Sequence, residues 1–429
     1  MATAAVRRGW IVTLSGTGIN LALGILYTWS IMKGAIADSI QRGGPGAFDW
    51  KASALNDPYA VCCIVFAFAT VLAGRIQDRF GPRITAFIGG LLVGIGFIWV
   101  SLTTSYVIWL LGFGLLAGAG IGFGYAAATP PALKWFPPEK TGLIAGVVVA
   151  GFGLASVYIA PISTYMVGSW GLQKSMLFFG VAFLVVVCGL SMFLVNPPPG
   201  HEFSRPTGSS VQAGAFGRGS LDAKPSEVFR KGSFYIIWCI FFIGAGAGLM
   251  VIGSVAGMAQ RSMGEAAFIA VAILAVGNAA GRILAGVLSD RIGRRTTLMM
   301  ILLFQAVLLL AAIPVVGSDN SSPFLVVLIA TFLGFNYGAN LSLFPSLTKD
   351  MWGLKNFGIN YGIVFTAWGV GGFVMGRMSQ MLVASSGSYT SSFIVAAVLL
   401  IAGSVLTLAL KKEKNTGQVQ IAGEKPAVA

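Results

Sequence analysis

Twelve long apolar windows constrain this chain more than any other feature of its sequence. Each is long enough, at about 1.5 Å per residue, for a helix to cross about 30 Å of hydrocarbon. Only 10% of the residues are charged, against about 25% in soluble domains. We therefore predict an all-α integral membrane protein with 12 transmembrane helices, over residues 10–32, 57–73, 84–102, 106–130, 142–165, 176–195, 234–258, 266–288, 297–316, 323–347, 357–382 and 389–410.

One long polar stretch, residues 196–231, divides these windows into six and six. It begins Asn-Pro-Pro-Pro-Gly and continues through serines, glycines and charges, which is typical of a linker. The predicted organisation is an N-terminal six-helix bundle (1–195), a cytoplasmic linker (196–231), a C-terminal six-helix bundle (232–410) and a cytoplasmic tail (411–429).

The net charge of +14 is distributed unevenly between the two sides of the predicted membrane. Most lysines and arginines fall in the loops of one side together with both termini, and cytoplasmic loops are the ones enriched in these residues. We therefore expect a multi-pass protein of the cell (inner) membrane with cytoplasmic termini, and no nucleic-acid partner. The opposite side carries only Lys33, Arg42, Lys51, Lys174 and Arg261.

An internal repeat relates the two sets of windows. A ten-residue loop motif beginning at Gly74 recurs 212 residues later, at Gly286. At the same offset the sequence around Tyr125 matches that around Tyr337, and the fifth and eleventh windows match loosely at an offset of 216. Two parallel six-helix repeats are typical of transporters that hold their substrate near the midplane between the halves.

The loop motif resembles that of the major facilitator superfamily, and the resemblance covers essentially the whole chain. It implies two six-helix bundles with pseudo-two-fold symmetry. The first glycine lets two helices approach closely, and we expect the aspartate and the arginine after it to pair across the inner surface and latch the halves. The predicted latch residues are Gly74, Asp78, Arg79, Gly81 and Arg83 in the first copy, and Gly286, Asp290, Arg291, Gly293 and Arg294 in the second.

The eighth window breaks the repeat with a polar pair, Asn278 and Arg282, where the first half has Phe66 and Thr70. The pair is spaced i, i+4 and so shares one helix face. Arg282 is eight residues before Asp290, hence about 12 Å deeper along the helix, and helical side chains lean toward the N-terminus, here toward the midplane. An intramembrane arginine normally faces a cavity with a partner. No window has an Asp or Glu in its interior, so we predict an anionic substrate as the counter-ion.

Aromatic residues in the windows expected to line the pathway would form the apolar wall of the site and supply single hydrogen bonds. With Arg282 and Asn278, the predicted substrate-binding residues are Tyr27, Trp29, Tyr125, Phe335, Tyr337, Tyr361, Phe365 and Trp368. Arg377, near the outer end of the eleventh window, either reaches the lipid phosphates or attracts anions to the outer mouth.

Several segments, among them Gly24 to Ser30 and Leu343 to Ser346, look like the oxalate/formate antiporter family, which is related to the monocarboxylate porters. By this resemblance Arg282 is the carboxylate-binding arginine. Trp368 stands where the oxalate exchanger has a second cation, a lysine, so one arginine is left to neutralise one charge, which favours a monocarboxylate such as lactate, pyruvate or formate. Asn278 stands where animal monocarboxylate porters have an aspartate, and an amide cannot take up a proton.

We therefore expect a secondary active transporter of small monocarboxylates, proton-coupled and monomeric. The alternatives are an oxalate:formate-type exchanger and a non-transporting membrane sensor of transporter fold. An enzyme is not expected, because the sole histidine, His201, lies in the linker and no acid–base or metal constellation is present. We expect no cofactor and no metal.

Overall fold

The computed structural model describes residues 2–198, 222–264, 267–316 and 322–410. Within these ranges the chain is helical, without strands, and twelve helical stretches are long and apolar enough to cross a membrane, as predicted. The first half contains α1 (Ala2–Leu23), η1 (Gly24–Thr28), α2 (Trp29–Arg42), η2 (Ala52–Ala54), α3 (Asp57–Phe80), α4 (Pro82–Ser101), α5 (Tyr106–Trp109), η3 (Leu110–Ala117), α6 (Gly118–Lys134), η4 (Pro138–Lys140), α7 (Thr141–Trp170) and α8 (Leu172–Ser191).

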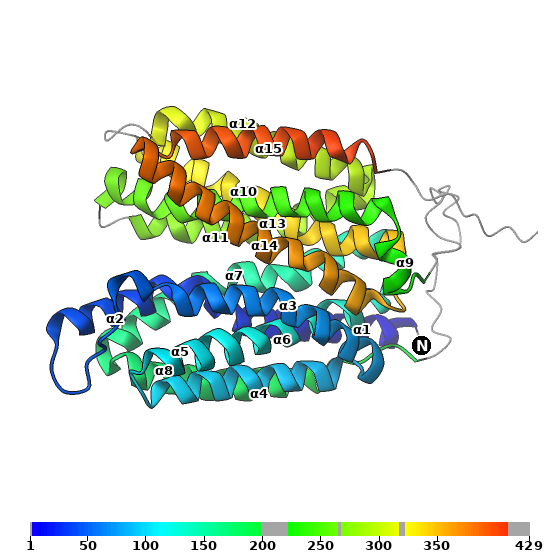
Figure 1. Ribbon diagram of the computed structural model, residues 1–429. Helices are drawn as coiled ribbons and strands as arrows, with labels where there is room; N and C mark the ends of the chain where they lie inside the picture. The colour runs from blue at the N-terminus through cyan, green and yellow to red at the C-terminus, as the bar shows by residue number, and fades with distance from the viewer. Residues whose placement is uncertain (1, 199–221, 265–266, 317–321, 411–429) are drawn as a thin grey trace, which may run out of the picture.

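A short helix, α9 (Pro225–Phe229), leads into the second half. That half contains α10 (Gly232–Met263), α11 (Ala267–Ile292), α12 (Arg294–Val316), α13 (Pro323–Trp352), α14 (Phe357–Ser386) and α15 (Thr390–Thr407). Figure 1 shows the two halves as separate groups of roughly parallel helices, and the chain enters and leaves at the same end of the bundle. We call this end the terminal face.

Two spans are not uninterrupted α-helices. The first passes from α1 through the 3₁₀ segment η1 into α2, and the fourth contains the π-helical segment η3 between α5 and α6. The break in the first span falls at Gly24, where an added Cβ would lie 2.1 Å from the Cβ of Ala155. The first span therefore changes from α-helical to 3₁₀ geometry at a point of close contact with α7.

Apolar side chains cover the outward faces of the peripheral helices. Val185 of α8, Val307 of α12 and Val405 of α15 are each about 60% exposed. Surfaces of this kind are stable against lipid and costly against water. The exposed apolar belt and the twelve spans together establish a multi-pass membrane protein.

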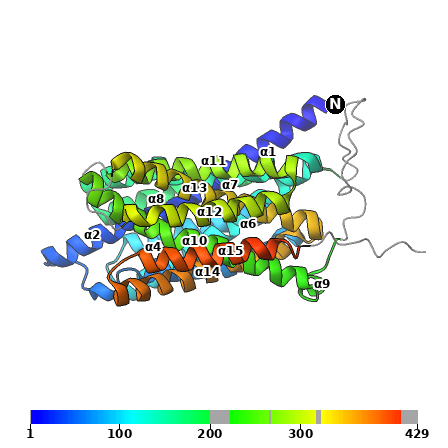
Figure 2. The same ribbon diagram turned by 90° about the horizontal axis from the view of Figure 1, so that it is seen from above.

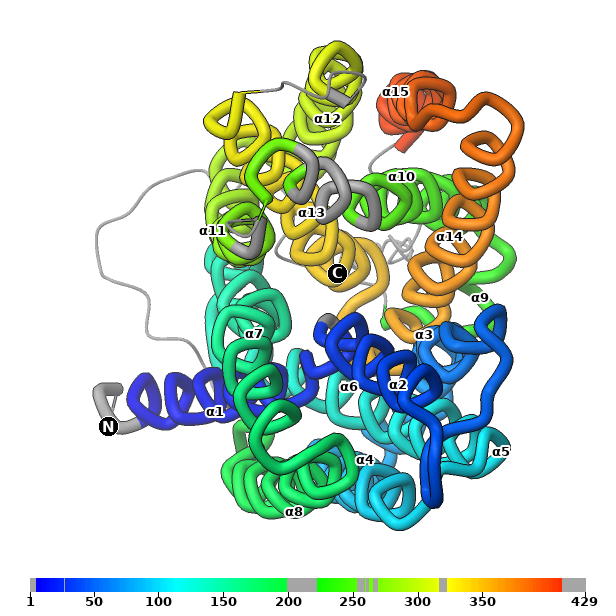
Figure 3. Tube along the Cα trace, turned by 90° about the vertical axis from the view of Figure 1, so that its left-hand side faces the viewer, coloured from blue at the N-terminus to red at the C-terminus, as the bar shows by residue number. Residues whose placement is uncertain are grey.

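The halves meet chiefly along two helix pairs, α3 with α14 and α7 with α11. Figure 1 shows α14 running obliquely across the second half until it reaches α3 near the terminal face. In the view along the bundle, α7 lies next to α11 and α3 next to α14 (Figure 3). The two pairs are exchanged by the repeat, because α3 corresponds to α11 and α7 to α14.

Candidate functional site

Arg282 of α11 lies at the junction of the halves and exposes none of its surface. Its Nε donates a hydrogen bond to Asn278 Oδ1 at 2.9 Å, so the two residues share one helix face as the spacing predicted. Its Nη1 donates to the backbone carbonyl of Val149, on α7 of the other half. Its Nη2 has no hydrogen-bond partner among the described residues.

The helix packing around Arg282 depends on small residues of α7. A Cβ added at Gly153 would lie 3.0 Å from Asn278 Oδ1 and 3.2 Å from Arg282 Nε. One added at Gly146 would lie 2.4 Å from the Arg282 carbonyl oxygen. Glycine on α7 thus lets the guanidinium reach the backbone of the opposite half.

Four of the predicted aromatic residues come together in a central aromatic cluster: Tyr125, Tyr361, Phe365 and Trp368. The hydroxyls of Tyr125 and Tyr361 are 3.3 Å apart, and Phe365 packs against both neighbouring rings, with centroids 4.9 Å from Tyr125 and 5.2 Å from Trp368. This cluster joins α6 of one half to α14 of the other.

Tyr337 extends the cluster through the second half, since the Trp368 indole N–H donates to its hydroxyl at 2.8 Å. Phe335 lies on the same helix, and its carbonyl oxygen would be 2.0 Å from a Cβ at Gly281, which places it at the contact of α13 with α11. Trp29 lies in a different group, stacked on Tyr59 and 4.7 Å from Phe113. The side chain of Tyr27 falls outside the described residues.

Two further rings, Phe66 and Phe152, pack against the central aromatic cluster and were not predicted as site residues. Their rings are 5.8 Å apart, and Phe66 also packs 5.1 Å from Trp368. The repeat contains a signal for both: Phe66 is the counterpart of Asn278, and Phe152 is the counterpart of Trp368. The carbonyl of Val149 has no sequence signal, because every residue has a carbonyl.

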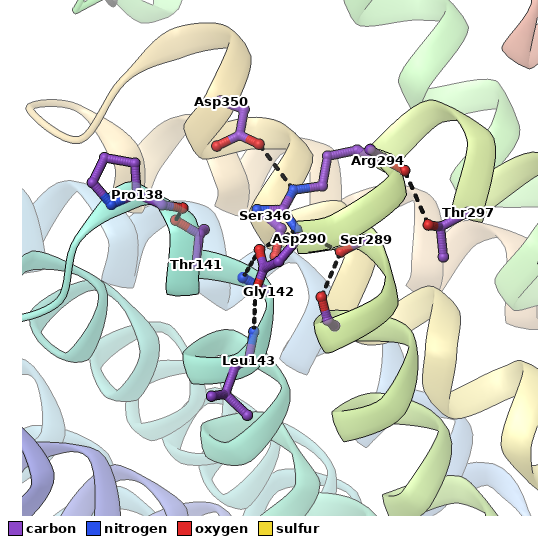
Figure 4. Close-up of polar contacts among 12 residues, drawn as sticks. Pro138, Thr141, Gly142, Leu143, Ser289, Asp290, Arg294, Thr297, Ser346 and Asp350 are labelled. Atoms are coloured by element: carbon purple, nitrogen blue, oxygen red, sulfur yellow. Dashed lines mark hydrogen bonds and ion pairs between the residues drawn. The ribbon is translucent and has the colours of Figure 1, made fainter. Parts of the chain in front are cut away.

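The repeated loop motif lies where the halves meet at the terminal face, and there Asp290 is the central group. Its carboxylate accepts backbone N–H bonds from Gly142 at 2.8 Å and Leu143 at 2.9 Å, at the start of α7 (Figure 4). Arg294 pairs with the same carboxylate at 2.6 Å and with Asp350 at 2.9 Å. Asp290 therefore joins the second half to the first.

Asp78 makes the symmetry-related contact. It accepts backbone N–H bonds from Gly358 at 3.0 Å and Ile359 at 2.9 Å, at the start of α14. The prediction that these aspartates pair with cations across the inner surface needs correction, because the groups across the interface are helix N-terminal N–H donors. A carboxylate suits such an end because the unpaired N–H groups and the helix dipole both favour negative charge.

The two glycines of each motif copy have different roles: the first allows two helices to approach closely, and the second lies in the turn between consecutive helices. A Cβ at Gly74 would be 2.1 Å from the Gly358 carbonyl oxygen, and one at Gly286 would be 2.2 Å from that of Gly142. Gly81 and Gly293 adopt φ of 88° and 93° between consecutive helices, a region that favours glycine.

The motif arginines do not act alike. Arg79 lies over the Phe80 ring at 5.2 Å, and both Arg79 and Arg291 are exposed. Arg83 lines a cleft with Arg7 and Arg8. Of the predicted latch arginines, Arg294 is the one that contacts a latch aspartate in the described part of the chain.

Comparisons with known proteins agree with this architecture. YhjX, an uncharacterised transporter of the major facilitator type from Escherichia coli, is 29% identical over 371 residues, covering 85% of this chain and 86% of its own length. The oxalate:formate antiporter of Oxalobacter formigenes is 27% identical over 393 residues, covering 91% and 88%. The apicoplast pyruvate carrier 1 of Toxoplasma gondii is 23% identical over 453 residues, covering 84% and 81%.

Solved structures share the fold at low sequence identity. The transporter FucP in its outward conformation superposes with a TM-score of 0.67 at 12% identity, covering 94% of this chain and 99% of its own. The proton:xylose symporter XylE gives 0.70 at 13% identity, covering 94% and 96%. The sequence model of the Major Facilitator Superfamily matches residues 9–376 and also 258–428. The chain therefore belongs to the Major Facilitator Superfamily of membrane transporters.

Proposed function

We propose that this transporter carries small monocarboxylates such as lactate, pyruvate or formate by alternating access, with Arg282 as the carboxylate-binding residue. The supporting observation is that the Arg282 side chain is buried and only partly hydrogen-bonded. A fully buried guanidinium has two neutral acceptors and one nitrogen without a partner among the described residues. A buried cation without a counter-ion is costly, and a carboxylate matches the guanidinium bidentately.

The relatives support a carboxylate substrate without choosing among carboxylates. One is named for oxalate and formate and another for pyruvate. A single negative charge is favoured, since the central aromatic cluster at the junction of the halves consists of phenols, an indole and a phenyl ring and supplies no second cation beside Arg282. Oxalate:formate-type exchange is the second candidate, favoured by the Oxalobacter relative.

The transporter is proposed to function as a monomer in the inner membrane with its terminal face toward the cytoplasm, where the cations of the loops gather. Net transport is proposed to be proton-coupled, with the proton taken up by a group other than Asn278, because an amide cannot be protonated at neutral pH. The test is uptake of labelled lactate, pyruvate, formate and oxalate into proteoliposomes, with internal pH recorded. Acidification that accompanies uptake supports symport. Uptake that requires an internal carboxylate and leaves pH unchanged identifies an exchanger, and no uptake of any of the four contradicts the proposal.

Asp78 and Asp290 are proposed to latch the terminal face closed. Asp290→Asn should open this face, because hydrogen bonds to a charged group are worth about 1.5–3 kcal/mol and the amide loses that charge. We expect a cysteine placed at Ser346, which is fully buried, to be labelled about tenfold faster, the low end of that range.

Asp350→Asn is the matched control. This substitution also removes a carboxylate that pairs with Arg294, but the contact of Asp350 with Arg294 lies within the second half and does not join the halves. Labelling in this variant should stay close to that of the parent. Equal labelling in both variants would contradict the latch.

Trp368 is proposed to set substrate valence by filling the place of a second cation. Trp368→Lys should raise competition by oxalate relative to lactate by about tenfold, the value of one added charge-assisted hydrogen bond. Trp368→Met is the control, since it also removes the indole bond to Tyr337 but adds no charge. An oxalate preference that rises equally in both variants would show that ring removal, not charge, sets valence.

A further inference from the structure

A cleft of about 540 Å³ lies at the terminal face, on the first half and apart from the substrate site. Three guanidinium groups line it, Arg7 and Arg8 from α1 and Arg83 from the start of α4. The rest of the lining is apolar and comes from Ile11 of α1 and from residues 192, 193 and 195 just after α8.

The last turns of α8 separate the two helices that supply the arginines. A Cβ at Gly18 of α1 would lie 2.7 Å from Leu190 Cδ1, and one at Gly90 of α4 would lie 2.8 Å from Cys188 Sγ. Beyond the contact with α8, the first turns of α1 project away from the bundle (Figure 2). The segment after α8 that lines the cleft is held by a hydrogen bond: the Trp135 indole N–H donates to the Val195 carbonyl at 2.7 Å.

The cleft arginines differ in their charge balance from the arginine of the second half. Arg294 lies between two carboxylates, those of Asp290 and Asp350. In the described part of the chain, none of Arg7, Arg8 and Arg83 is ion-paired with a carboxylate. Three positive charges brought together without compensation repel one another, and a bound anion relieves that repulsion.

The position of the cleft restricts which anion fits. It lies at the rim of the bundle, and the side chains of Met192 and Phe193 are more than half exposed beside the arginines. Ile84 and Leu14, exposed on α4 and α1, continue an apolar surface along these two helices. A soluble anion would contact the arginines and leave the apolar side chains uncovered, whereas an anionic lipid contacts the arginines with its head group and covers the apolar side chains with its acyl chains.

We propose that this cleft binds the phosphate head group of an anionic phospholipid of the leaflet at the terminal face, with its acyl chains along α1 and α4. Arginine binds phosphate bidentately, and basic pockets at the cytoplasmic ends of transmembrane helices suit anionic head groups. The bound lipid fixes the projecting start of α1 against α4 and α8.

The experiment measures binding of phosphatidylglycerol to the purified full-length protein by native mass spectrometry, with phosphatidylcholine of the same acyl chains as the neutral lipid. The variant combines Arg7→Gln, Arg8→Gln and Arg83→Gln. The control removes three exposed cations of the same face that do not line the cleft, Lys140→Gln, Arg230→Gln and Arg295→Gln.

Phosphatidylglycerol should bind wild type and control alike and the cleft variant at least about tenfold more weakly. Equal binding to cleft variant and control would overturn the proposal. Inorganic phosphate at millimolar concentration should displace little of the lipid, and full displacement would show a site for free anions instead.

A second measurement needs no variant and so does not depend on the triple substitution folding. A photoreactive phosphatidylglycerol should cross-link to wild type within residues 7–14 of α1, residues 83 and 84 of α4 or residues 190–195, and unlabelled phosphatidylglycerol should compete. Cross-links confined to other helices would overturn the assignment.

Discussion

Arg282→Gln is expected to abolish carboxylate binding while the protein folds as well as wild type or better. Truncating one partner of a buried charge pair costs about 2–5 kcal/mol, so affinity should fall by at least about thirtyfold. The empty protein, however, loses a buried guanidinium that has one unpartnered nitrogen. Its melting temperature should therefore be equal to or above that of wild type, and added lactate or pyruvate should no longer raise it.

Arg282→Lys separates charge from shape. The ammonium keeps the positive charge but cannot bind a carboxylate through two parallel N–H bonds, so binding should be weakened about tenfold or more. Wild-type affinity in Arg282→Gln would remove this residue from the site. A lower melting temperature of empty Arg282→Gln would show that the guanidinium stabilises the fold through Val149 and Asn278.

Gly286→Ala is expected to prevent closure at the terminal face and to stop transport. The new Cβ would lie 2.2 Å from the carbonyl oxygen of Gly142, on the backbone of the opposite half, so the contact cannot relax by side-chain rotation. Gly74→Ala should have the same effect through Gly358. Both variants should label strongly at a cysteine placed at Ser346 and should show uptake close to background.

Gly189→Ala is the matched control, because this α8 glycine has no atom within 4 Å of an added Cβ. Alanine there should leave uptake unchanged and raise helix stability by up to about 1 kcal/mol. Normal uptake in Gly286→Ala would mean that α7 and α11 need not approach this closely during transport.

Much of the fold is predictable because the bilayer imposes one length and one polarity on every span. The twelve spans and the two halves follow from apolar windows and a repeat. The first span is the main difference: residues 10–32 were predicted, whereas the helical stretch runs over Ala5–Arg42. The extra turns beyond Met32 carry Lys33, Asp38 and Arg42 among their apolar residues, and these charges end the hydropathy window although the helix continues.

The site is predictable where side-chain chemistry is unusual and less so where geometry decides. Arg282 and Asn278 are recognisable in the sequence because polar and charged side chains are costly in a membrane-spanning helix and therefore usually have a function. Trp29 shows the reverse, since an aromatic residue in a span looks the same in the sequence whether its ring faces the pathway or packs on Phe113. The partners of Asp78 and Asp290 could not be predicted, because they are backbone N–H groups.

Under the proposed function, Arg282 Nη1 has two roles, because the nitrogen that would bind the substrate also donates to the Val149 carbonyl of the opposite half. A substrate that takes this nitrogen must outcompete a carbonyl of the opposite half, so measured affinity is the difference between two interactions rather than the strength of one. The free energy of the hydrogen bond between α11 and α7 therefore lowers the net free energy of substrate binding by the same amount. Variants that loosen this contact without changing Arg282 should therefore bind substrate more tightly than wild type.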